Sequence, residues 1–157
     1  MLTLFKFLNL CSVFVWVGGI VFFSFILTPT LFKTIPKETT SKVLDALFPK
    51  YYFLGYLCGA VALLTQLLGW FRGSGGVVVF TLRLAVLVGM VFFTYYAGLI
   101  VFPEAHRLKV EMQGTSAGEA PSEITKQFHK IHRLSVLLNV LVLLLGLAYI
   151  WILAKTG

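Results

Sequence analysis

Charged residues are scarce in this sequence. They make up 12% of its 157 residues, whereas a soluble domain of this size carries about a quarter. Hydrophobic residues account for 59%, and the mean hydropathy is +0.92. Too few polar side chains are present to cover a water-soluble globule. The composition therefore excludes an ordinary soluble enzyme and predicts a single integral membrane domain over residues 1–157.

Cysteine and acidic residues are also rare. Cys11 and Cys58 both lie in apolar segments, and they fit neither a metal-ligand spacing nor a secreted disulfide framework. We expect them to be small apolar residues of the interior. Six acidic residues against 13 basic ones give a net charge of +7. The basic residues sit in short segments between apolar runs, which argues against nucleic acid as a partner and indicates contact with anionic lipid headgroups.

Four long apolar segments are present. A hydrocarbon core about 30 Å thick requires roughly 20 apolar residues in a helix. The segments that meet this length are residues 4–28, 51–71, 77–102 and 134–154. The predicted fold is therefore all-α, an integral membrane bundle of four transmembrane helices. We expect a tight turn at residues 73–76 and an added helix in each longer connection, 29–50 and 103–133, the first lying in the headgroup plane.

The distribution of lysine and arginine predicts an orientation. The N-terminus, the Gly-rich turn and the C-terminus together carry three basic residues, Lys6, Arg72 and Lys155. The two longer connections carry nine: Lys33, Lys37, Lys42, Lys50, Arg107, Lys109, Lys126, Lys130 and Arg133. Because basic loops stay in the cytoplasm, we expect a multi-pass protein of the cell inner (plasma) membrane with both termini outside.

Two stretches suggest that the chain is a pair of tandem helical hairpins. LTPTLFK (27–33) is similar to VFPEAHR (101–107), and each places a proline at the exit of a span. The first and third spans run the same way, so the halves would be parallel repeats about an axis along the membrane normal. This alignment sets Asn9 opposite Arg83, a residue that we expect to snorkel towards the interface.

Polar residues inside the spans mark candidate binding positions. In FHKIHRLSVLLN (128–139), a helical rotation of about 100° per residue puts His132 and Asn139 about 20° apart, with Ser135 about 60° to one side. His129 lies about 60° to the other side. Polar groups in lipid usually face a bundle interior or a cavity. We therefore predict a ligand-binding site at His132, Ser135 and Asn139 near the cytoplasmic face, and we add Asn9 of the first span as a further candidate.

The same region suggests a metal site. His129 and His132 are spaced i, i+3, and the topology brings His106 and Glu104 from the exit of the third span to the same side. Three imidazoles and a carboxylate fit ligation of Zn, Cu or Fe. The alternative is that these interfacial histidines simply contact water and headgroups. The cofactor stays open between none, a transition metal and haem b.

Several motifs together resemble a known family. TPTLF (28–32), FPKYY (48–52), the Pro103 exit and FHKIHRLSVLLN are similar to the transmembrane protein 205-like family, four-span membrane proteins with a domain of unknown function. The resemblance covers nearly the whole chain and implies the fold without an assigned chemistry. The positions that it carries over are Gly18, Gly19, Pro29, Phe32, Pro49, Tyr51, Pro103, His132, Ser135 and Asn139.

A fainter resemblance concerns NLCSVFVWVGGIVFF (9–23). It is similar to the first helix of the copper resistance D family and of the J-type membrane protoporphyrinogen oxidase, which binds haem b. In the latter, a histidine seven residues before the tryptophan carries the haem. Here that position is Asn9, a poor haem ligand, so the resemblance implies lost or altered ligation.

Three functions remain open from the sequence. The first is a non-enzymatic membrane protein that binds or moves a small solute or metal ion at the His132 site. The second is a haem- or metal-dependent redox protein that uses His106, His129 and His132. The third is an accessory subunit of a larger membrane complex, or a homo-oligomer, whose apolar faces bind partner helices. No catalytic triad, P-loop or carboxylate pair indicates an enzyme.

Overall fold

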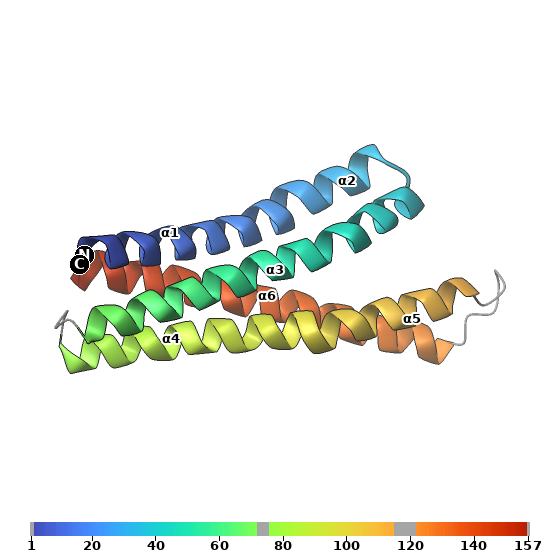
Figure 1. Ribbon diagram of the computed structural model, residues 1–157. Coiled ribbons are helices and arrows are strands. Elements are labelled where there is room, and N and C mark those ends of the chain that lie inside the picture. Colours follow the sequence, from blue (N-terminus) through green and yellow to red (C-terminus); the bar gives the residue numbers. More distant parts are fainter. Residues whose placement is uncertain (1, 72–75, 115–121, 157) are drawn as a thin grey trace.

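The computed structural model describes residues 2–71, 76–114 and 122–156, and every regular element in those ranges is helical (Figure 1). In chain order the elements are α1 (Leu2–Val21), η1 (Phe22–Leu27), α2 (Thr28–Thr34), α3 (Lys37–Trp70), α4 (Val77–Tyr96), η2 (Ala97–Val101), α5 (Phe102–Gly114) and α6 (Ser122–Thr156), where η denotes a π-helix. The predicted all-α fold is confirmed. The predicted turn at 73–76 lies outside the described residues except for Gly76.

Four helices are long and apolar enough to cross a membrane. They run over Leu2–Thr34, Lys37–Trp70, Val77–Met112 and Glu123–Thr156. The chain is thus a multi-pass membrane protein by length and composition. The expected helix in the 29–50 connection is not separate, because α3 continues from Lys37 through Pro49 to Trp70. A helix satisfies its own backbone hydrogen bonds, and one internal proline removes only one N–H donor, so the continuous helix is tolerated.

The chain forms two helical hairpins that pack side by side. One consists of α1, η1 and α2 against α3, and the other of α4, η2 and α5 against α6 (Figure 1). Contacts of α1 with α6 and of α3 with α4 join them. The N- and C-termini lie together at one end, and α2 and α5 lie at the other (Figure 1).

Each hairpin has a π-helix at the same place. η1 ends two residues before Pro29, and η2 ends two residues before Pro103. A proline ring clashes with the carbonyl four residues earlier in an α-helix, and a wider π turn accommodates it. This shared feature is consistent with the proposed tandem hairpins.

The core lies where α1, α3, α4 and α6 meet. Its buried residues include Val13, Trp16, Ala62, Leu87, Met90, Val142 and Tyr149. Gly18 and Gly19 do not mark a close helix approach, because a Cβ at Gly18 would meet nothing within 4 Å and one at Gly19 would be in ordinary contact with Leu54 at 3.6 Å. The close approaches occur at Gly59, Gly98 and Gly146, where an added Cβ would lie under 3.0 Å from a neighbouring side chain.

Candidate functional site

A cleft of about 340 Å³ lies between η1 and α6, and we call it the η1/α6 cleft. His132, Ser135 and Asn139 line it from α6, while Ser24 of η1 and Thr28 of α2 line it from the other hairpin. The structure therefore brings together the three α6 residues that the helical periodicity placed on one face. His129, on the edge of that face, is exposed and is not part of the lining.

Tyr51 of α3 contacts two residues that line the cleft, Asn139 and Phe23. The Tyr51 hydroxyl of α3 donates to Asn139 Oδ1 at 2.9 Å. The Phe23 ring lies 4.7 Å from the Tyr51 ring and 5.2 Å from the Phe48 ring, measured between centroids. The hydrogen bond holds the Asn139 amide in place between two helices. Its nitrogen carries two N–H donors that are not used in this bond.

The π-helix determines the shape of the η1 wall. The backbone N–H of Thr28 donates to the carbonyl of Phe23, five residues earlier, which is the hydrogen bond of a π-helix. The extra residue in the turn changes the direction of the side chains that follow it. Single π turns inside α-helices often occur at functional sites. The π-helix η1, which interrupts the α-helical conformation between α1 and α2, therefore forms one wall of the cleft.

The four residues predicted to bind metal do not form a metal site. Glu104 accepts two hydrogen bonds from Arg107, at 2.6 and 3.0 Å, and His106 Nδ1 lies 3.8 Å from Asp45 Oδ1. The rings of His129 and His132 each lie 6.1 Å, centroid to centroid, from the ring of their helix neighbour Phe128. Across residues 2–71, 76–114 and 122–156, no group of three or more His, Cys, Asp or Glu could hold a metal ion. The structure therefore gives the metal prediction no support.

Ion pairs account for this arrangement. Asp45 of α3 is bound to Lys109 Nζ of α5 at 2.5 Å, and Glu104 is paired with Arg107 of its own helix. The carboxylates near the histidines are thus already neutralised by cations. The Asp45–Lys109 pair also ties the two hairpins together at the α2/α5 end.

Asn9, the fourth predicted ligand residue, lies in a separate network. Its Nδ2 donates to Ala62 O at 2.8 Å and to Thr65 Oγ1 at 3.1 Å, and its Oδ1 accepts from the Tyr149 hydroxyl at 2.7 Å. The same hydroxyl lies 3.1 Å from Gln66 Oε1, and its single proton serves one acceptor at a time. Tyr149 is ten residues, or about 15 Å, along α6 from Asn139. Asn9 is therefore not brought together with His132, Ser135 and Asn139.

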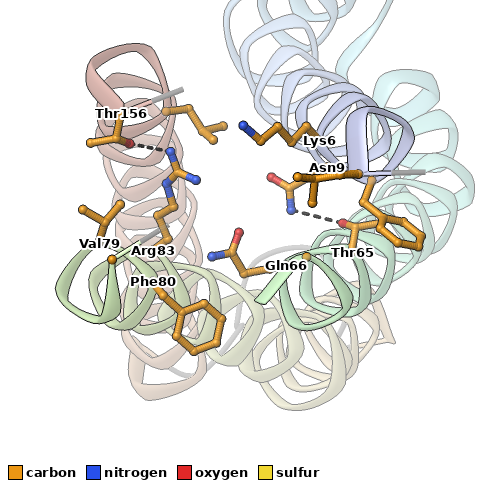
Figure 2. A pocket seen from close by; sticks show the side chains of 13 residues that line it. Lys6, Asn9, Thr65, Gln66, Val79, Phe80, Arg83 and Thr156 are labelled. Carbon is orange, nitrogen blue, oxygen red and sulfur yellow. Dashed lines mark hydrogen bonds between the residues drawn. The ribbon is translucent and has the colours of Figure 1, made fainter. Parts of the chain in front are cut away.

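This network forms one wall of a second cavity, of about 180 Å³, which we call the terminal pocket because it lies at the end where the two termini meet (Figure 2). Residues of α1, α3, α4 and α6 surround it. Figure 2 shows Lys6, Asn9, Gln66 and Arg83 arranged around the same space.

The family resemblance carried over Tyr51, but sequence reasoning identified neither Tyr51 nor Tyr149 as a hydrogen-bond partner in these networks. Tyr51 binds Asn139, and Tyr149, which is fully buried, binds Asn9. The available signal was general: an amide in the middle of an apolar span needs a partner. No spacing along the chain reveals which helix supplies that partner.

Residues 11–114 match the family model described as Domain of unknown function (DUF4149). The chain belongs to the DUF4149 family. This DUF4149 member is also 31% identical over 146 residues to an uncharacterized protein of Aquifex aeolicus (strain VF5), a match that covers 93% of this chain and 92% of the relative. No solved structure gives a significant match. The family match includes η1 but ends before α6, which carries His132, Ser135 and Asn139.

Proposed function

We propose that this DUF4149 protein is a non-enzymatic membrane protein that binds a small uncharged amphiphile in the η1/α6 cleft. The observation that carries the proposal is that His132, Ser135 and Asn139 line one cleft together with Ser24 and Thr28. A few hydrogen-bonding groups in mostly apolar walls are the usual composition of a small-molecule site. The polar groups would orient the head of the ligand, and the apolar walls would take its hydrocarbon part.

The lining supports an uncharged ligand. Among the described residues, no Lys, Arg, Asp or Glu lines the cleft. An ion that leaves water without an opposite charge is costly. Phe23, Phe48 and Leu143 are among the apolar residues that line the rest. Each Å² of hydrocarbon that they cover contributes about 25 cal/mol to binding.

The rim supports access from the bilayer. Phe25 and Val136 line the cleft, and their side chains remain 64% and 50% exposed. These exposed apolar residues belong to helices that we assign to the membrane, so their surroundings would be lipid tails. A ligand that already resides in the bilayer could reach the cleft without crossing water.

A photoactivatable probe tests this proposal. We expect a fatty alcohol that carries a diazirine to cross-link to η1 and α6 in the purified full chain, as mapped by peptide mass spectrometry. Val136→Phe adds bulk inside the cleft at a half-exposed position, so it should reduce the cross-linking at least about tenfold, as steric exclusion from a pocket does. Leu137→Phe, the matched control, makes the same change at the next residue, which is 55% exposed and does not line the cleft.

Equal labelling of the two phenylalanine variants would rule out the cleft as the site. Ser135→Ala gives a second readout, because removal of one neutral hydrogen bond weakens binding by about 0.5–1.5 kcal/mol. That loss corresponds to roughly a two- to twelvefold weaker interaction.

The orientation in the membrane is part of the proposal and has its own test. In a background in which Cys11 and Cys58 are replaced by alanine, we expect Thr39→Cys to react with a membrane-impermeant maleimide only in inverted vesicles. Thr3→Cys should react only from the outside of intact cells. Both positions are exposed. The reverse labelling pattern would place the basic connections outside and overturn the inferred topology.

We also infer kinship with the transmembrane protein 205-like family. The support is the resemblance of TPTLF (28–32) and of the Pro103 exit, together with the π-helix that precedes each of these two prolines. Under this kinship, His132, Ser135 and Asn139 are carried-over positions that line one cleft.

A further inference from the structure

Among the described residues, two cations and no carboxylate line the terminal pocket. The cations are Lys6 of α1 and Arg83 of α4. In Figure 2 the Lys6 ammonium and the Arg83 guanidinium approach the same central space from opposite sides. Within the described ranges, neither cation has a carboxylate within ion-pair distance. Two like charges that share a pocket repel each other unless an anion lies between them.

The distribution of acidic residues along the sequence extends this excess of positive charge from the pocket to that end of the molecule. All six Asp and Glu side chains fall in the two long connections, residues 29–50 and 103–133. The described helices of those connections, among them α2 and α5, lie at the end of the bundle opposite to the chain termini (Figure 1). Within residues 2–71, 76–114 and 122–156, no acidic side chain lines the terminal pocket to neutralise Lys6 and Arg83.

The guanidinium of Arg83 has at least one N–H donor that no described residue accepts. Its Nη2 donates to Thr156 Oγ1, which in turn donates to Ile152 O at 2.6 Å. Its Nε–H is buried and has no hydrogen-bond partner in the part of the chain that the structure describes. A buried donor without an acceptor is destabilising, and more so when the group is charged. Arg83 is thus held across to α6 by one bond while other N–H groups remain available.

We propose that the terminal pocket binds a phosphate-type oxyanion between Arg83 and Lys6. A guanidinium pairs with phosphate oxygens through two parallel hydrogen bonds, and an ammonium adds a point charge. The volume of about 180 Å³ is enough for such a group. Lys6 and Arg83 lie four and six residues inside their helices, so they sit within about 9 Å of the bundle end, the depth of lipid headgroups.

Two sources could supply this oxyanion, the headgroup of an anionic lipid and free phosphate. The recognising chemistry is the same for both. The site is about two to three helical turns from the η1/α6 cleft, it uses different residues, and it does not rest on the function proposed above.

Binding measurements on the purified full chain test the assignment. In nonionic detergent, native mass spectrometry would count bound phosphatidylglycerol and phosphatidylcholine, and calorimetry would measure inorganic phosphate. We expect phosphatidylglycerol to be preferred over phosphatidylcholine, and Arg83→Gln and Lys6→Gln each to weaken the anion about tenfold or more, the effect of losing a charge-assisted hydrogen bond. Lys155→Gln is the matched control, because it removes one positive charge at the same end from a residue that stacks over Trp151 and does not line the pocket.

The lipid and inorganic phosphate measurements together identify the source of the oxyanion. Phosphatidylglycerol binding that inorganic phosphate does not displace assigns a lipid headgroup, and displacement by millimolar phosphate assigns a free anion. Similar affinities in Arg83→Gln, Lys6→Gln and Lys155→Gln, or equal binding of the two lipids together with no binding of inorganic phosphate, would overturn the proposal and leave Arg83 as a snorkelling side chain. If Arg83→Gln does not fold by circular dichroism, Lys6→Gln still tests the site, because Lys6 is exposed.

Discussion

Replacing Gly98 with valine is expected to lower the free energy of unfolding by about 3 kcal/mol, the upper part of the usual range for an overpacked interior. Gly98 lies in η2, where the backbone runs directly against α3. A Cβ there would lie 2.8 Å from Tyr52 Cγ and would overlap the Tyr56 hydroxyl. The Tyr52 ring is 3% exposed and packs against Phe48 and Phe102, so it has no space to move into.

The measurement is unfolding in mixed micelles with increasing dodecyl sulfate, followed by circular dichroism. Gly18→Val is the matched control, because its Cβ meets nothing within 4 Å and Gly18 is exposed. We expect that variant to change stability by less than about 0.5 kcal/mol, as surface substitutions do. Equal destabilisation of the two variants would mean that α3 and η2 do not approach as the structure shows.

The second large effect is expected for Asn9→Leu, a loss of about 1–2 kcal/mol of stability, the scale of hydrogen bonds between transmembrane helices. Asn9 is 4% exposed and joins three helices, since it contacts Ala62 and Thr65 of α3 and Tyr149 of α6. Leucine has a similar volume but supplies neither donor nor acceptor. The nearby Gln66 offers the Tyr149 hydroxyl another acceptor, which limits the loss.

A double-mutant cycle with Tyr149→Phe separates this network from simple packing. The two substitutions remove the same Asn9–Tyr149 bond, so we expect their effects to be non-additive by about 0.5–1.7 kcal/mol. Thr81→Val serves as the control, because Thr81 is exposed and bonds only to Val77 of its own helix. Strictly additive effects of Asn9→Leu and Tyr149→Phe would show that the bond contributes nothing to stability.

The spans and the polar face of α6 could be predicted because both depend on local pattern. Hydropathy over about 20 residues identifies a span, and rotation of about 100° per residue places His132, Ser135 and Asn139 together. What could not be predicted is what this face meets. The opposite wall of the cleft comes from Ser24 and Thr28, more than 100 residues earlier, and no periodicity relates the two segments.

The structure gives the metal prediction no support for a related reason. Topology alone placed Glu104 and His106 at the depth of His132, but it could not indicate which side chains already had partners. Arg107 binds Glu104, and Asp45, which lies in a different connection, approaches His106. Similarly, Gly18 and Gly19 look like a helix-packing motif in the sequence, yet the tight contacts fall on single glycines such as Gly98 and Gly146. Packing partners are a tertiary property that residue type does not encode by itself.

The separation of acidic residues from the terminal pocket has a consequence for how the molecule responds to salt. At the α2/α5 end, Lys42, Arg107 and Lys109 form ion pairs with carboxylates. Among the described residues, the charged side chains at the end with the terminal pocket are all positive: Lys6, Arg83 and Lys155. Because dissolved salt screens exposed charges, added salt would weaken attraction between opposite charges at the α2/α5 end and repulsion between like charges at the other end.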